Sequence, residues 1–111
     1  MKISTHVKNT YSKLGIEARD IHEWIDGLFD HKRFEKFCHT GALGDFNPYD
    51  HRRQRHCREA ADDAVKEFIE KYPEEIIRIV FEDHVREDYF GFFPSRADYD
   101  DPNFHEKYHI Y

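Results

Sequence analysis

The feature that most constrains the fold is an apolar stripe at helical spacing after Pro73. Five apolar residues recur there: Ile76, Ile77, Val80, Phe81 and Val85. This spacing places them on one side of an α-helix, and Pro73 suits the first turn because its missing N–H is not needed there. Gly91 and Pro94 are expected to end the helix. The same residues are β-branched enough to leave a strand over 76–81 as an alternative.

A first helix is expected near the N-terminus. Its apolar residues share one stripe: Val7, Tyr11 and Leu14. Ser4 or Thr5 would cap its start, and Gly15 stands where a helix would end.

Two longer helices are expected between these, from Ile16 to Phe37 and from Pro48 to Lys71. The intervening residues 39–47 hold two glycines and no sustained period, which indicates a loop. The stretch from Ser95 to Asp98 resembles a capping arrangement for one further turn. The sequence therefore predicts an all-α fold, a compact bundle of about four helices with an irregular aromatic C-terminal tail.

The length of 111 residues suits one core, so residues 1–111 are expected to form a single helical domain. Hydrophobic residues make up 39% and aromatic residues 16% of the chain, which excludes a disordered composition. No stretch approaches the roughly 20 apolar residues that cross a bilayer. We also find no secretory signal. We therefore expect a soluble, cytoplasmic protein in which Cys38 and Cys57 are reduced.

Charge is unevenly placed along the chain. The net charge is −6, and the segment from Pro73 to Phe104 carries nine acids against three arginines. Such an acidic face suits a basic protein partner or a cation, and the many aromatic residues nearby could cover the core or form a homodimer contact. The basic run from His51 to Arg58 is more typical of a salt-bridged surface, so nucleic-acid binding is not expected.

Two histidine–aspartate pairs stand at same-face helical spacing in a chain with nine histidines. His22 and Asp26 are four residues apart, as are His84 and Asp88. His84 also continues the apolar stripe of its helix, so its imidazole should point inward, where it needs a partner. The pairs predict a divalent-metal site, and the alternative is a core histidine hydrogen-bonded to a carboxylate or carbonyl.

His56, which lies between these two pairs in the sequence, is expected to supply a further ligand. The predicted metal ligands are His22, Asp26, His56, His84 and Asp88. Additional or outer members are His6, His51, Cys57, Glu59 and Glu82. His56 and Glu59 are three residues apart and could act together. Cys57 lies on the core stripe, where a cysteine is more typically a small buried hydrophobe than a ligand.

This mixture of nitrogen and oxygen ligands favours zinc, with iron, manganese or nickel as alternatives. A bound ion with an open position can activate water, and Glu82 or Glu87 could then move the proton, so hydrolysis is one function to consider. The sequence has no His-Glu-x-x-His motif, no Cys-x-x-Cys pair and no glycine-rich phosphate loop. It therefore names no reaction, and whether the protein is an enzyme stays open.

Several motifs together resemble a family of small uncharacterised bacterial and phage proteins. These motifs are His6, the segment Ile21 to Asp26, His51-Arg52 with Arg55-His56 and Glu59, and the segment Glu82 to Asp88 leading to Gly91, Pro94-Ser95 and Asp98. They cover most of the chain in order. The resemblance implies a compact helical fold with polar residues clustered around His22, His56 and His84, and it implies no activity.

The chain departs from that family at three places. The position of Cys57 is commonly histidine there, the position of Asp83 is commonly glutamine, and Tyr108 to Tyr111 replaces a C-terminal tryptophan. If position 57 coordinates a metal, a thiolate in place of an imidazole would favour zinc over a metal used for oxygen chemistry.

Two functions from different classes follow from these patterns. One is a metal-binding helical domain, with hydrolysis as its extension. The other is a non-enzymatic interaction protein, an inhibitor or regulator of the phage or mobile-element kind, that binds a partner through its acidic aromatic surface. The histidine cluster would then be a structural network that fixes helix packing.

Overall fold

The computed structural model describes residues 1–27 and 50–104, with side chains from position 52 onward in the second stretch. These ranges contain helices and no strand, which confirms the all-α prediction. None of the described helices is long and apolar enough to cross a bilayer. The elements are α1 (Ile3–Leu14), α2 (Arg19–Ile25), α4 (Asp50–Arg55), η1 (Arg58–Ala60), α5 (Ala61–Phe68), α6 (Glu74–Asp88) and η2 (Arg96–Asp100).

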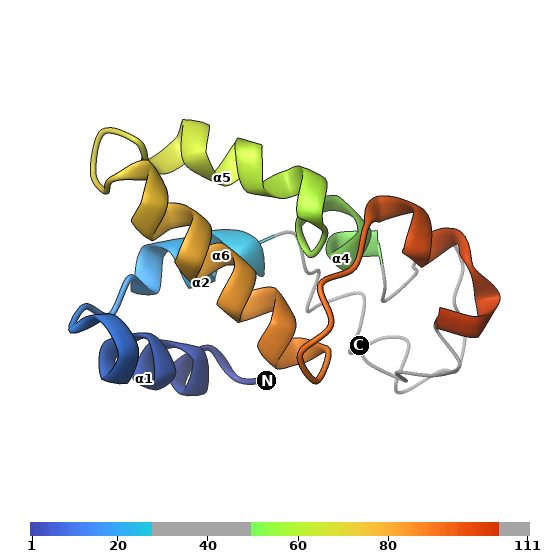
Figure 1. Cartoon of the computed structure of the whole chain (residues 1–111), viewed down its shortest axis with the longest axis horizontal. Coiled ribbons are helices and arrows are strands. Elements are labelled where there is room, and N and C mark those ends of the chain that lie inside the picture. The colour runs from blue at the N-terminus through green and yellow to red at the C-terminus, as the bar shows by residue number, and fades with distance from the viewer. Residues whose placement is uncertain (28–49, 105–111) are drawn as a thin grey trace, which may run out of the picture.

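The central element is α6, which contacts α1, α2 and α5. In Figure 1, α5 runs along one side of it and α1 along the other. Most of its predicted stripe is fully buried: Ile77, Val80, Phe81 and Val85. Pro73 precedes the helix, and Glu74 and Glu75 in the first turn favour its start through the helix dipole. The stretch 76–81 is therefore helical, and the alternative of a strand was wrong.

The start of α1 differs from the prediction. The helix begins at Ile3 with Lys2 in the N-cap position, so neither Ser4 nor Thr5 caps it. Its predicted end is confirmed, because Gly15 adopts a left-handed conformation with φ 76° and its N–H closes the last turn.

The buried face of α1 also differs from the predicted stripe. It consists of His6, Val7 and Thr10. Tyr11, predicted on that stripe, is 60% exposed. The face is shifted because α1 packs against α2 and α6, where other polar side chains supply partners for His6 and Thr10.

The second helix starts later than predicted. α2 begins at Arg19 rather than Ile16, because the chain turns at Ala18, whose φ is 49°. Ile21 and Ile25 are fully buried and anchor α2 in the core. The predicted continuation of this helix to Phe37, the loop 39–47 and the tail from residue 105 lie outside the described residues.

The predicted continuous helix from Pro48 to Lys71 was wrong, because the chain breaks after α4. Cys57 is extended, with φ −141° and ψ 159°, and separates α4 from η1 and α5. The N–H of Arg58 donates to the carbonyl oxygen of Pro94 at 2.9 Å instead of continuing a helix. Cys57, Ala61 and Ala64 still have helical spacing in the sequence, so the spacing could not reveal the interruption.

The segment after α6 covers this break. In Figure 1 the η2 region lies beside α4. The predicted cap is confirmed, since the N–H of Ser95 donates to the Asp98 carboxylate at 2.7 Å. Tyr99 packs against Tyr89 and Phe104, and its hydroxyl donates to the carbonyl oxygen of His56. These aromatic side chains therefore cover the edge of the core, and the homodimer contact stays a prediction.

Candidate metal centre

Four of the five predicted ligands meet where α2 and α6 approach the break after α4. The atoms they offer all lie within 4.8 Å of one another: Asp26, His56, His84 and Asp88. The side chains of His56 and His84 are 0% exposed and that of Asp88 is 2% exposed, whereas that of Asp26 is 26% exposed. Helical spacing places His84 beside Asp88, and the break after Arg55 brings His56 to them.

The two imidazoles face the same two carboxylate oxygens. His56 Nε2 lies 3.1 Å from Asp26 Oδ1 and 3.2 Å from Asp88 Oδ2. His84 Nε2 lies 3.3 Å from the same oxygen of Asp26 and 3.7 Å from the same oxygen of Asp88. We call these four residues the Asp/His cluster. Nitrogen and oxygen atoms alternate around a shared point, which is an arrangement able to hold a cation.

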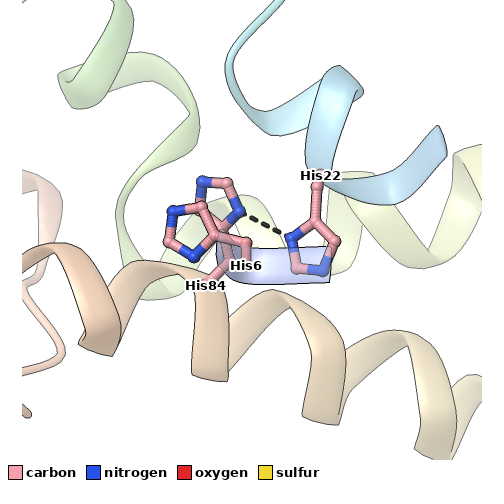
Figure 2. A group of neighbouring side chains, drawn as sticks. All are labelled: His6, His22 and His84. Carbon is pink, nitrogen blue, oxygen red and sulfur yellow. Dashed lines mark hydrogen bonds between the residues drawn. The ribbon is translucent and has the colours of Figure 1, made fainter. Parts of the chain in front are cut away.

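His22, the fifth predicted ligand, contacts the opposite nitrogen of His84. Figure 2 shows His6 from α1, His22 from α2 and His84 from α6 gathered together, with His22 beside the overlapping rings of the other two, and these three form a second group that could hold a metal. The His6 and His84 rings are stacked at 3.8 Å between centroids. His22 Nδ1 lies 2.8 Å from His84 Nδ1. This leaves Nε2 of His84 for the Asp/His cluster.

Thr10 extends this contact and was not among the predicted site residues. Its Oγ1 lies 2.8 Å from His22 Nε2, and both side chains are buried. A signal was present, because Thr10 follows His6 by four residues and so shares its helical face.

The histidines of this contact are held neutral. Burial, and then the positive charges that His84 and His6 would carry, lower the pKa of His22 to about 3. Burial also lowers the pKa of His84 to about 4, despite the opposing hydrogen bond to Asp26. Both imidazoles are therefore uncharged at neutral pH, which is the form that binds metals.

The two aspartates of the cluster are held ionised. Burial acts to raise the pKa of Asp26, but hydrogen bonds from His56 and His84 outweigh it and keep that pKa well below its usual range. Burial likewise opposes ionisation of Asp88, and hydrogen bonds from His56 and His6 lower its pKa. Two ionised carboxylates beside the neutral imidazole of His84 are groups in the protonation state that binds a divalent cation.

Asp88 also contacts three basic groups. His6 Nε2 lies 3.2 Å from its Oδ1, and the amino group of Met1 lies 3.0 Å from the same atom. Burial acts to lower the pKa of His6, but contacts with Asp88 and with Glu87, 2.8 Å from Nδ1, raise it. Arg52 Nη1 lies 3.5 Å from Asp88 Oδ2. Arg52 was predicted to lie on a surface, although it precedes His56 by four residues.

The remaining predicted members lie apart from the cluster or outside the described side chains. Cys57 is buried and its Sγ donates to the carbonyl oxygen of Arg53 at 3.5 Å. Burial raises the pKa of its thiol. Glu59 accepts the Arg96 N–H at 3.0 Å, and Glu82 pairs with Arg86 at 3.4 Å. The side chain of His51 is not among those described.

The basic run is engaged within the chain. Arg53 pairs with Asp100 at 3.2 Å, Arg55 donates to the carbonyl oxygen of Trp24 at 2.6 Å, and Arg58 donates to that of Phe93 at 2.7 Å. Arg53 fits the interpretation of this run as a salt-bridged surface. Arg52 does not, because it is 4% exposed and lies beside Asp88.

Comparisons with known proteins do not assign this chain to a family. No family model, curated protein or solved structure shows a significant match to this chain. The resemblance to bacterial and phage proteins therefore stays a prediction.

Proposed function

We propose that this protein binds one divalent metal ion, zinc first, through Asp26, His56, His84 and Asp88. The observation that carries the proposal is the set of nitrogen–oxygen distances within the Asp/His cluster. Zinc bonds of about 2.0–2.2 Å in tetrahedral geometry separate neighbouring ligand atoms by about 3.3–3.6 Å. The four nitrogen–oxygen contacts of the cluster, from 3.1 to 3.7 Å, bracket that range.

The contacts of the ligands also support metal binding. Metal-bound histidines normally donate their second ring N–H to a nearby acceptor, which fixes the ring. His84 offers Nε2 to the cluster and has His22 at 2.8 Å from its other nitrogen. Asp88 is held by Arg52 and His6 at the distances given above, so a bound ion would meet an oriented carboxylate.

The same geometry favours a metal that stabilises the fold. Structural zinc sites use four protein ligands, whereas catalytic sites keep a position open for water. The cluster joins α2, α6 and the break after α4, so one ion would link three segments that are distant in the chain. A hydrolytic role would require water to take one ligand position, and Asp26 is the most exposed ligand of the four.

Zinc titration of metal-free, untagged protein tests the proposal. Calorimetry should show one zinc ion bound per chain, and elemental analysis of the dialysed complex should agree. Asp88→Asn keeps the side-chain shape but removes the charge of a ligand, so it should weaken zinc binding by at least about 100-fold, since loss of a residue that only supports a ligand costs about 10- to 100-fold.

Glu82→Gln is the matched control, because Glu82 lies on the same helix and pairs with Arg86 instead of the cluster. It should bind zinc as the wild type does. Circular dichroism checks that each variant is folded. A folded wild-type protein that binds no zinc, iron, manganese or nickel would overturn the proposal. Equal zinc affinity in Asp88→Asn and the wild type would place the site elsewhere.

A further inference from the structure

A continuous line of buried polar atoms leads from α1 to the Asp/His cluster. Thr10 Oγ1 lies 2.8 Å from His22 Nε2, and His22 Nδ1 lies 2.8 Å from His84 Nδ1. His84 Nε2 then lies 3.3 Å from Asp26 Oδ1. Both histidines are 0% exposed, and Thr10 is 5% exposed. The line therefore has no bulk water to supply alternative partners between its ends.

Hydrogen bonding allows this line only two directions. A neutral imidazole carries one N–H and one acceptor nitrogen. The Nδ1–Nδ1 contact therefore needs one histidine as donor and the other as acceptor, and this choice sets the remaining bonds. Next to the carboxylate of Asp26, which only accepts, His84 Nε2 must carry the proton. His22 Nδ1 then donates to His84, and the Thr10 hydroxyl donates to His22.

Metal ligation by His84 requires the opposite direction. A metal takes the electron pair of Nε2, so the proton of His84 must sit on Nδ1. His84 Nδ1 then donates to His22 Nδ1, and His22 Nε2 donates to the Thr10 hydroxyl oxygen. The hydroxyl proton is free to bond the carbonyl oxygen of His6, four residues earlier in α1.

We propose that metal binding reverses the hydrogen-bond direction of the line from Thr10 through His22 to His84. The inference rests on the proposed zinc site and makes Thr10 and His22 positioning residues. One proton leaves at Nε2 of His84 and one enters at the Thr10 end, so each imidazole and the hydroxyl keep one exchangeable proton. No group changes its charge, and only the tautomers of the two histidines change.

Thr10 stands where a proton can enter. It borders a surface hollow of about 370 Å³ that is also lined by Asn9, Lys13, Glu87 and Gly91. The other end of the line is the partly exposed Asp26. Each end thus borders solvent, although Thr10 itself is 5% exposed, whereas the two imidazoles between the ends are fully buried.

The geometry favours this role for His22 over a second metal site. Its distance of 2.8 Å to His84 is that of a strong hydrogen bond, and it is shorter than the roughly 3.3 Å between ligand atoms on tetrahedral zinc. The stacked rings of His6 and His84 direct their in-plane electron pairs side by side instead of toward one point. The nitrogens of His6 face Glu87 and Asp88.

Nitrogen-15 spectra of the histidine side chains test the reversal directly. Full-length labelled protein is compared without metal and with one equivalent of zinc, and the tautomers of His22 and His84 are assigned from their ring couplings. His84 should change from Nε2–H to Nδ1–H, and His22 from Nδ1–H to Nε2–H. Zinc binding with no change in either tautomer would overturn the inference while leaving the proposed site intact.

Two substitutions at His22 provide an independent measurement. His22→Leu removes the acceptor for His84 Nδ1–H and should weaken zinc binding about 10- to 100-fold. His22→Gln supplies an amide oxygen in its place and should recover most of that loss. Equal zinc affinity in all three proteins, or binding of a second zinc ion that His22→Leu abolishes, would contradict the inference. Absence of any zinc binding would instead contradict the proposed function.

Discussion

Helix α6 and the interrupted stretch from α4 to α5 both supply residues of the Asp/His cluster, but they do so by different means. On α6, His84 and Asp88 are neighbours because they are four residues apart in a regular helix. His56 instead reaches the cluster where the helix ends and Cys57 becomes extended. A regular helix thus determines which side chains are neighbours from their spacing alone. Where the helix breaks, the position of the next side chains depends on contacts with residues far away in the chain.

The largest expected effect on stability is at His84, the residue of α6 that contacts His22, Asp26 and Asp88. His84→Ala removes a fully buried ring and takes one buried partner each from Asp26 and His22, so it should lower the free energy of unfolding by about 3–5 kcal/mol. Urea unfolding of metal-free protein measures this loss. Glu82→Ala on the same helix should stay within about 0.5 kcal/mol of the wild type. A loss below 1 kcal/mol, roughly a surface effect, would mean that α6 does not depend on the cluster.

Zinc should act mainly on the interrupted stretch. At a free zinc concentration about 100-fold above Kd, the free energy of unfolding should rise by about 2.7 kcal/mol. Hydrogen exchange should show the larger gain in protection at residues 56–60, because α6 already has continuous helical hydrogen bonds. An equal gain in protection along α6 and along the stretch from α4 to α5 would show that zinc does not act mainly on the interrupted stretch.

A smaller effect is expected where the C-terminal segment supports the break. Tyr99→Phe removes the hydroxyl that donates to the carbonyl oxygen of His56 and should cost about 1–2 kcal/mol, with weaker zinc binding. Thermal and urea unfolding, with calorimetry for zinc, provide the measurements. The control is Tyr11→Phe, since Tyr11 is 60% exposed on α1. If both variants behave alike, the hydroxyl of Tyr99 does not hold the break.

The smallest effect on zinc is expected at Cys57, beside His56. Its thiol faces the carbonyl of Arg53, so Cys57→Ala should leave zinc affinity unchanged and cost only about 1 kcal/mol of stability. Calorimetry of the variant, with Asp88→Asn for comparison, measures this. A tenfold loss of zinc affinity would show that the thiol is a ligand.

Much of the site was predictable because it depends on local spacing. The pairs His22/Asp26 and His84/Asp88 follow from helical periodicity, and the burial of His84 follows from its place after Ile77 and Val80. The role of Thr10 was not predicted, because its partner His22 lies on another helix. Arg52 was assigned to the surface because it stands in a run of four arginines, which is typical of a solvated face. Its spacing of four residues from His56 was the local sign that it shares the buried face.

The sequence by itself determined the all-α fold, the buried stripe of α6 and the same-face pairing of histidine with aspartate. Each follows from a period of 3.6 residues and from the preference of apolar groups for the core. Only the tertiary structure decided that His56 joins Asp26 and Asp88, while His22 contacts the other nitrogen of His84. The reason is that the break at Cys57 depends on Pro94 and Tyr99, about forty residues away, and local periodicity carries no information about such contacts.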